Sequence, residues 1–155
     1  MAIAFFDLDK TLLRNNSASG WIRYELNHGN ISLRQAAWGI YYISRYHLGL
    51  GAQEDAYRRA IAVYSGQSAQ ELARRTADFY HSMVREDFRP GARAAVEWHR
   101  ERGDTLVLLT SSSNYMSDLV SRDLRLDHYL CTRFEVDDAC LNTGRPVEPI
   151  CAGEG

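Results

Sequence analysis

The chain has 155 residues, of which 45% are hydrophobic and 25% are charged, and its formal net charge is −2. This length is typical of a single domain, and the composition is that of a folded globular protein without low-complexity tracts. A net charge so close to zero gives no strong overall field toward nucleic acid or an anionic membrane, so we expect neither as a partner. No segment approaches the ~20 apolar residues that span a bilayer, and we expect a cytoplasmic protein.

The first expected element is a strand at residues 3–6. This short run is apolar and partly aromatic, and acidic residues follow it at once. Such a pattern is typical of a buried strand that ends at a polar site. The strand would deliver Asp7 to that site.

A block with the apolar spacing of helices follows, from residue 17 to about residue 88. Ser32 with Gln35, and Ser68 with Glu71, have the spacing of capping boxes, in which each side chain bonds the other's backbone amide. With glycines at plausible breaks between these segments, the pattern predicts four helices.

Helices and strands alternate in the rest of the chain. The predicted elements are a helix from Pro90-Gly91 to residue 103, a strand at 105–109 with the polar loop 110–113, a helix at 114–124, a brief strand at 129–131, and a hairpin at 134–143 turning near Asp137-Asp138.

This order of elements favours an α/β fold. One strand, a large helical insertion and then alternating helices and strands are what a Rossmann-like parallel sheet with an inserted cap would give. We expect residues 1–14 and 89–155 to form the α/β core and residues 15–88 to form a helical cap.

Asp7 and Asp9 lie two residues apart just after the first strand. If strand geometry continues through them, both side chains project to the same side at the carboxyl end of the strand, where open α/β sheets bind ligands. Two carboxylates in one pocket repel each other unless a divalent cation or a shared proton is present, and Mg²⁺ prefers oxygen ligands. The alternative is that Asp7 and Asp9 only begin a turn.

The segment Phe6-Asp7-Leu8-Asp9-Lys10-Thr11-Leu12-Leu13 resembles the first motif of the haloacid dehalogenase (HAD) superfamily, D-x-D-x-T. Thr110-Ser111-Ser112, after a hydrophobic strand, is similar to the second motif. The helical cap between the two motifs resembles that of subfamily IB, the phosphoserine phosphatase-like branch, and so does the region around residues 131–144.

The resemblance implies a Mg²⁺-dependent phosphatase that acts on a small phosphorylated metabolite such as phosphoserine, although phospholipid and nucleotide substrates stay open. Asp7 would be the nucleophile that forms an aspartyl phosphate, and Asp9 the general acid and base. The Asp7 carboxylate and the Asp9 carbonyl would hold the metal. Thr11 would fix the loop at the substrate, and Thr110 with the amide of Ser111 would bind phosphate oxygens.

Some of these residues have structural alternatives. Thr11 fits an ordinary turn, and Thr110 fits the end of a strand. Lys10 is a candidate cation for phosphate, but a backbone role is favoured. Asp137-Asp138 is expected to form a hairpin turn rather than an acidic metal-binding motif.

Two further motifs of the superfamily, a lysine and a later pair of acidic metal ligands, have no counterpart, since no lysine follows Lys10. We therefore expect an α/β fold that is incomplete at its C-terminus, in a fragment of a protein about 60–80 residues longer. An exposed sheet edge would invite self-association, and we expect the 155-residue form to be less stable and much less active than the longer protein.

Two other classes of function stay open. One is a receiver-like signalling module, although its phospho-acceptor would lie at a later strand. The other is a catalytically impaired or non-catalytic binding or scaffold protein with the same fold. The cap contains Trp21, Trp38 and most of the tyrosines, and the sequence does not identify which of these side chains would line the site.

Overall fold

The computed structural model describes residues 2–48 and 53–151. The elements in chain order are β1 (Ile3–Phe6), η1 (Leu8–Leu12), α1 (Ser17–Asn27), α2 (Leu33–His47), α3 (Gln53–Ala62), α4 (Ala69–Phe79), η2 (Tyr80–Val84), η3 (Arg85–Asp87), α5 (Pro90–Glu101), β2 (Thr105–Ser113), α6 (Asn114–Leu124), β3 (His128–Val136) and β4 (Asn142–Val147). No helix in these two ranges combines the length and apolar character needed to cross a membrane.

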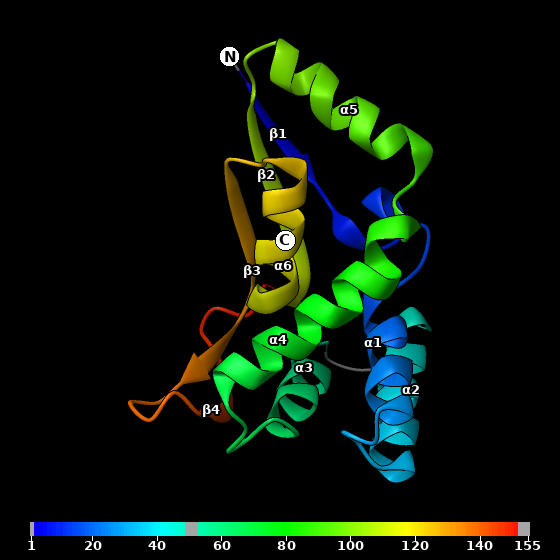
Figure 1. Ribbon diagram of the computed structural model, residues 1–155, viewed down its shortest axis with the longest axis vertical. Helices are drawn as coiled ribbons and strands as arrows, with labels where there is room; N and C mark the ends of the chain where they lie inside the picture. The colour runs from blue at the N-terminus through cyan, green and yellow to red at the C-terminus, as the bar shows by residue number, and fades with distance from the viewer. Residues whose placement is uncertain (1, 49–52, 152–155) are drawn as a thin grey trace.

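The strands form one sheet in the order β1-β2-β3-β4. The first three strands are parallel, with Phe6 opposite Leu108 and Val107 opposite His128, while β4 runs antiparallel to β3. Parallel neighbours require crossover connections, which the cap with α5, and then α6, supply (Figure 1). The predicted α/β fold with a mostly parallel sheet is confirmed.

One face of the sheet supplies the apolar core. Ala4, Leu106 and Leu108 are buried there, and Val96 of α5 and Val120 of α6 belong to the same cluster. This burial follows from strand alternation, because every second side chain of β1 and β2 points to the same face. The intervening residues of β1 are exposed.

The cap helices α1 to α4 occupy the lower half of the molecule in Figure 1. The chain segments that enter and leave this region lie side by side: Leu13 forms an antiparallel bridge with Phe88, and the Arg89 amide donates to the Leu12 carbonyl at 2.9 Å. Apolar side chains from the end of this region, including Phe79 and Tyr80, pack in the core cluster. The division at residues 15–88 stays a prediction.

The predicted caps are present. The Ser32 amide donates to Gln35 Oε1 at 2.8 Å and the Gln35 amide to Ser32 Oγ at 3.2 Å, which is the reciprocal pattern of a capping box. The Glu71 amide donates to Ser68 Oγ at 3.3 Å, so Ser68 caps α4. The four helices predicted between residues 17 and 88 are confirmed as α1 to α4.

Two predicted elements had wrong boundaries. The strand expected at 129–131 is the nine-residue β3, because pairing with β4 continues it to Val136. Residues 110–113 belong to β2 rather than to a loop, with an irregular register between Leu109 and Ser113. The hairpin itself is confirmed, and its turn is closed by Asp137 Oδ1, which accepts from the amides of Ala139 and Leu141.

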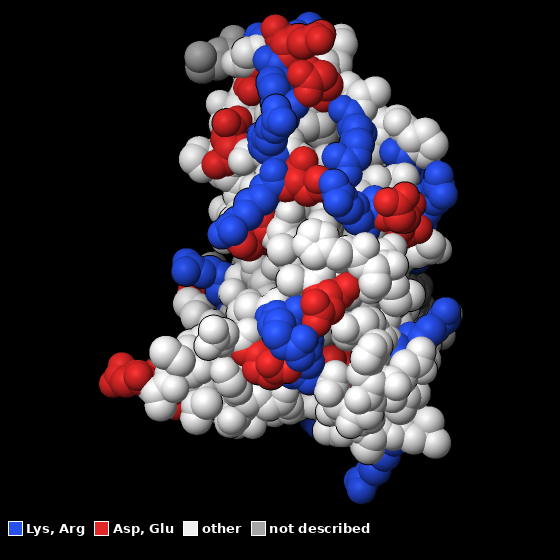
Figure 2. All heavy atoms as spheres, in the orientation of Figure 1, with Lys and Arg blue, Asp and Glu red and all other residues white. Residues whose placement is uncertain are grey.

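Charged side chains are distributed unevenly over the surface. Figure 2 shows Asp, Glu and Arg interleaved over the part that α5 occupies. Arg93 of this helix pairs with Asp123 at 2.7 Å, and Arg100 pairs with Glu97. The part over α1 and α2, at the lower right of the same view, is largely uncharged.

Candidate active site

Asp7 lies directly after β1, at the carboxyl end of the sheet. The chain then makes one wide turn, η1, in which the amides of Leu12 and Leu13 donate to the carbonyls of Asp7 and Leu8 at 3.3 and 2.9 Å. Leu8 and Leu12 are buried in the core, whereas Asp7 is exposed. The turn thus anchors its leucines in the core and leaves the Asp7 carboxylate open to a ligand.

Thr11 orients this carboxylate. Its hydroxyl donates to Asp7 Oδ2 at 2.7 Å, across four residues of the turn. A hydroxyl that donates to a carboxylate favours the ionised form and restricts its rotation. Thr11 therefore contacts the predicted nucleophile directly.

Asp9 is held at the start of α1. Its Oδ1 accepts from the Ser17 amide at 2.7 Å, and its Oδ2 accepts from Asn16 Nδ2 at 3.4 Å. Burial raises the pKa of Asp9 above its usual range, although hydrogen bonds from Ser17 act in the opposite direction, and the charge of Asp7 raises the pKa further. A carboxyl group with a raised pKa retains its proton more readily, as a general acid requires.

The end of β2 meets the first loop. Ser17 Oγ and Ser112 Oγ lie 3.5 Å apart, which brings the two predicted motifs together. Thr110 is buried, and its Oγ1 accepts from the Ser112 amide at 3.1 Å, so the threonine side chain stabilises the irregular end of β2. Thr110 and Ser111 as phosphate-binding residues stay a prediction.

The cap also reaches the end of β2. Tyr57, on α3, donates a hydrogen bond from Oη to Ser111 Oγ at 2.5 Å. The sequence did not single out Tyr57 for the site, because its spacing with Ile61 and Tyr64 equally fits a helix that packs on its neighbours. Tyr57 thus joins the predicted cap to Ser111, a predicted substrate-binding residue.

Arg89 stabilises the η1 turn through hydrogen bonds, and Lys10 has an unusual backbone conformation within it. Lys10 has a left-handed backbone (φ 61°), and Arg89 donates from Nη2 to the Lys10 carbonyl at 3.1 Å and from Nε to the Leu13 carbonyl at 3.3 Å. These contacts give Lys10 a backbone role in the turn, as favoured from the sequence. The sequence did not indicate this role of Arg89, because Arg89 belongs to no motif and was expected only to mark the point where the chain returns from the cap to the core.

The oxygen atoms of Asp7 and Asp9 fit a Mg²⁺ site with few protein ligands. Within residues 2–48 and 53–151, no group of three or more His, Cys, Asp or Glu side chains could hold a metal ion. Both carboxylate oxygens of Asp9 already accept hydrogen bonds. The Asp7 carboxylate and the Asp9 carbonyl are therefore the oxygen ligands that this segment offers to a metal ion. Mg²⁺ commonly takes one or two protein oxygens and completes its octahedron with water and substrate phosphate, so this donor set fits.

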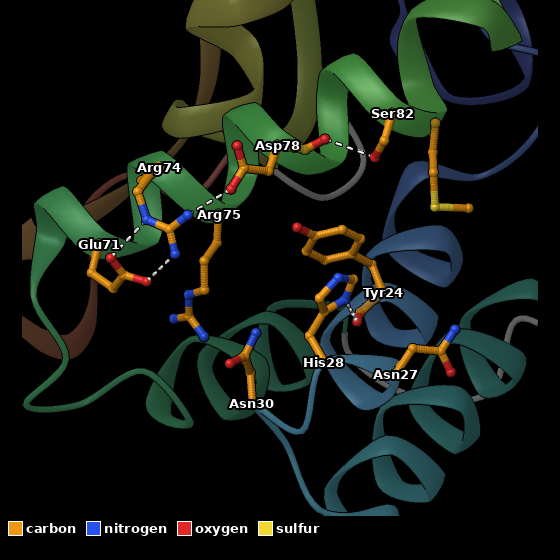
Figure 3. A pocket seen from close by; sticks show the side chains of 10 residues that line it. Tyr24, Asn27, His28, Asn30, Glu71, Arg74, Arg75, Asp78 and Ser82 are labelled. Atoms are coloured by element: carbon orange, nitrogen blue, oxygen red, sulfur yellow. Dashed lines mark hydrogen bonds and ion pairs between the residues drawn. The ribbon is translucent and has the colours of Figure 1, made fainter.

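A separate pocket of about 650 Å³ lies between α1 and α4 (Figure 3). Arg74 spans its wall between Glu71 and Asp78, at 2.7 Å from each. Beneath it, Arg75 pairs with the fully buried Glu25 at 3.0 Å. None of the predicted catalytic or phosphate-binding residues lines this pocket, so it is distinct from the candidate active site.

An acidic turn follows the first strand of the parallel sheet, and it meets the serine-rich carboxyl end of the second strand. Residues 4–155 match the family model for haloacid dehalogenase-like hydrolases, and the chain belongs to this family. The family recognised from the sequence is thereby confirmed.

Curated relatives include phosphatases. The chain is 28% identical over 159 residues to phosphoserine phosphatase SerB1 of Mycobacterium tuberculosis, with 99% of this chain and 51% of that protein covered. It is 27% identical over 159 residues to a putative hydrolase of Mycobacterium leprae, with 99% and 52% covered. The chain therefore spans about half the length of the curated relatives it matches.

Solved structures share the fold. A protein of unknown function from Bordetella pertussis Tohama I superposes with a TM-score of 0.85 at 24% identity, covering 97% of this chain and 68% of the other. A substrate-bound phosphoserine phosphatase superposes with a TM-score of 0.67 at 14% identity, covering 94% and 61%. These similarities establish the HAD-like fold of the described chain.

Proposed function

We propose that this chain carries the nucleophile of a phosphoric monoester hydrolase, acting on a small phosphorylated metabolite through an aspartyl phosphate on Asp7. The observation that carries the proposal is the exposed Asp7 carboxylate at the end of β1, with Thr11 bonded to one of its oxygens at 2.7 Å. Family membership and the phosphatases among the relatives support it.

In the first step, Asp7 attacks the phosphorus atom of the substrate. The new bond joins a carboxylate oxygen of Asp7 to phosphorus, and the bond between phosphorus and the leaving oxygen breaks. Asp9 gives its proton to that oxygen, so the product departs as an alcohol. The raised pKa of Asp9, which burial causes, supports this role because it keeps the proton available.

In the second step, water attacks the phosphorus of the aspartyl phosphate. Asp9, now ionised, takes a proton from this water, and the bond between phosphorus and the Asp7 oxygen breaks. Inorganic phosphate leaves and both aspartates return to their starting states. Thr11 keeps the Asp7 oxygen aligned throughout, and Thr110 with the Ser111 amide would hold phosphate oxygens.

The Asp7 carboxylate and the Asp9 carbonyl would hold Mg²⁺. When bound, the ion neutralises negative charge on the transferring phosphoryl group. Ser17 and Asn16 contribute indirectly, because their hydrogen bonds to the Asp9 carboxyl fix the segment that also presents the Asp9 carbonyl.

A small substrate is consistent with how closely the cap approaches the end of β2. The hydrogen bond between Tyr57 and Ser111 places an aromatic ring of the cap beside the predicted phosphate site. The relatives named as phosphoserine phosphatase and histidinol-phosphatase act on small phosphomonoesters by name. We extend that class of substrate, rather than one compound, to this chain.

The test is hydrolysis of p-nitrophenyl phosphate with and without Mg²⁺ by the wild-type chain and by Asp7→Asn. We expect slow, Mg²⁺-dependent turnover in the wild type and none in the variant. Asp138→Asn, an exposed carboxylate in the hairpin turn, is the matched control and should leave the rate unchanged. Binding of a phosphate analogue without any turnover would instead favour the scaffold alternative, and equal rates in wild type and Asp7→Asn would refute the proposed nucleophile.

The edge of the sheet formed by β1 is a candidate surface for self-association. In the described sheet, β1 pairs only with β2, and its Ile3 and Phe5 side chains are exposed, which supports self-association through this edge. Sedimentation at rising protein concentration would test it, since a chain that stays monomeric contradicts it. A cytoplasmic location stays a prediction.

A further inference from the structure

The outward side of α2 is apolar. Leu33 and Leu48, at the two ends of the helix region, are 73% and 71% exposed, and Ile40 between them is 55% exposed. Single exposed apolar residues are ordinary on protein surfaces, but here they recur along one helix. These side chains therefore form one exposed apolar surface along the helix.

Helical geometry joins these residues into one stripe. Each residue of an α-helix is rotated by ~100° about the helix axis relative to the residue before it. On this projection, six exposed positions of the α2 region fall within one arc of roughly 100°, and we define them as the outer face of α2. They are Leu33, Ala37, Ile40, Tyr41, Ser44 and Leu48. Gly39 lies on the other side of the helix, against Ile22 of α1, and Ala36 near the edge of the arc is buried; the helix contacts α1 and α3. The helix thus has an inner apolar side that packs and an outer apolar side that meets solvent.

The charges around this face are of one sign. From Leu26 to Leu48 the chain contains Arg34 and Arg45 but no Asp or Glu. In α1 the single acidic residue is Glu25, which is fully buried and paired with Arg75. The next acidic side chains along the chain, Glu54 and Asp55, are in the first turn of α3. In Figure 2 the part of the surface over α1 and α2 is white, with blue at its margins.

Aromatic side chains border the outer face. Trp38 contacts Tyr41 and Tyr42, with ring centroids 5.8 Å apart in both cases, and Trp38 and Tyr41 are exposed. Trp and Tyr favour the boundary between lipid headgroups and acyl chains, because their rings are apolar and their polar atoms stay hydrated. Arg45 also stacks over Tyr41, at 5.8 Å from its ring centre.

We infer that the outer face of α2 docks on an anionic lipid surface, with its apolar stripe inserted at the headgroup boundary and Arg34 and Arg45 against lipid phosphates. An interfacial helix of this kind needs an apolar face, flanking aromatics and basic residues, and no spanning length. Binding of such a helix to anionic lipid depends on the charges beside the docking face. The overall charge of −2 therefore does not oppose it. A lipid surface matches both features of this face, because acyl chains accommodate the apolar stripe and lipid phosphates pair with the arginines.

The experiment is flotation of the 155-residue chain with vesicles made of equal parts phosphatidylcholine and phosphatidylglycerol, compared with vesicles of phosphatidylcholine alone. We expect binding to the anionic vesicles, weakened by added salt. Ile40→Glu should weaken binding by about tenfold or more, since it removes apolar insertion and adds a negative charge. Val136→Glu, which changes an exposed β-branched residue on β3, is the matched control and should bind as the wild type does.

Two further measurements keep the inference testable if Ile40→Glu does not fold. Arg34→Gln should weaken binding to anionic vesicles by about fivefold. Vesicles with brominated acyl chains should quench the tryptophan fluorescence of the wild type more strongly than that of Trp38→Phe. Absence of binding to anionic vesicles, or equal binding by the folded variants and the wild type, overturns the inference. So does a dimer in lipid-free solution that Ile40→Glu dissociates while vesicles do not bind, because the occupant would then be a second copy of the chain.

Discussion

Tyr57 of the cap donates a hydrogen bond of 2.5 Å to Ser111 at the end of β2. The two residues lie 54 positions apart in the sequence, and this contact joins α3 directly to the predicted phosphate-binding loop. Nearby, Ser17 and Ser112 approach within 3.5 Å, so the start of α1, the end of β2 and α3 converge. The cap therefore takes part in the geometry of the site.

Replacing Tyr57 with Phe removes this hydrogen bond while retaining the ring. We expect kcat/KM for a phosphomonoester to fall about two- to tenfold, because one neutral hydrogen bond is worth about 0.5–1.5 kcal/mol. Steady-state kinetics would measure it, with the exposed Tyr129→Phe as the control, which should behave as wild type. Since Ser111→Ala removes the same contact, the double variant should lose little more than either single variant, and fully additive losses would show that Tyr57 acts elsewhere.

Thr11→Val tests the contact that orients Asp7. The substitution keeps the shape of the side chain but removes the hydroxyl that donates to Asp7 Oδ2 at 2.7 Å. Hydrogen bonds to charged groups are worth about 1.5–3 kcal/mol, and because Thr11 is exposed we expect the lower end, a loss of about tenfold in kcat. Thr11→Ser retains the hydroxyl and should recover most of the rate. A Val variant as active as the wild type would be incompatible with this role.

The buried ion pair of the cap should dominate its stability. Arg75 and Glu25 are 3.0 Å apart with side chains 9% and 0% exposed, and burial raises the pKa of Glu25 despite the hydrogen bond from Asn30 and the charge of Arg75. Glu25→Leu leaves a buried unpaired charge and should lower the free energy of unfolding in urea by about 3–5 kcal/mol.

Replacing both members of this pair should be far less costly. The double variant Glu25→Leu/Arg75→Met removes both buried charges, and we expect it to recover most of the stability. Asp118→Asn, which breaks an exposed pair with Arg122 at 3.1 Å, is the control and should change the free energy of unfolding by less than about 1 kcal/mol. A single Glu25→Leu variant as stable as this control would show that the pair is not desolvated.

Asp104 should make the core's stability depend on pH. The hydrogen bond from His99 and that from the Ala2 amide hold the pKa of Asp104 below its usual range. Because the folded-state pKa is lower than the unfolded one, the folded chain binds fewer protons, and the stabilisation is present above the unfolded pKa of about 3.9. It is lost as the pH falls through the folded pKa.

Asp104→Asn should therefore have a lower Tm than the wild type at neutral pH, and the difference should shrink in acid. Thermal melts followed by circular dichroism between neutral pH and pH about 3 would measure this change. A difference in Tm that stays constant across the range would mean that the charge of Asp104 contributes nothing.

The sequence was most informative where local rules decide the structure. The apolar run before Asp7 predicted β1, and the Ser32 and Ser68 caps predicted helix starts. Each depends on residues within a few positions of one another.

Long-range contacts were the part that could not be predicted. β3 continues to Val136 only because β4 pairs with it, and Tyr57 meets Ser111 only because the cap folds over β2. Helical spacing identifies which side chains share a face but not what that face contacts.

The account depends most directly on Asp7 as the phosphorylated residue. The decisive measurement is rapid quenching of the chain with a phosphomonoester and Mg²⁺, reduction of the acyl phosphate with borohydride, and peptide mapping by mass spectrometry. Reduction converts a phosphorylated aspartate to homoserine, so we predict homoserine at position 7 in the wild type and no modification in Asp7→Asn. Modification at another residue, or measurable hydrolysis with no modification at Asp7, would contradict the account.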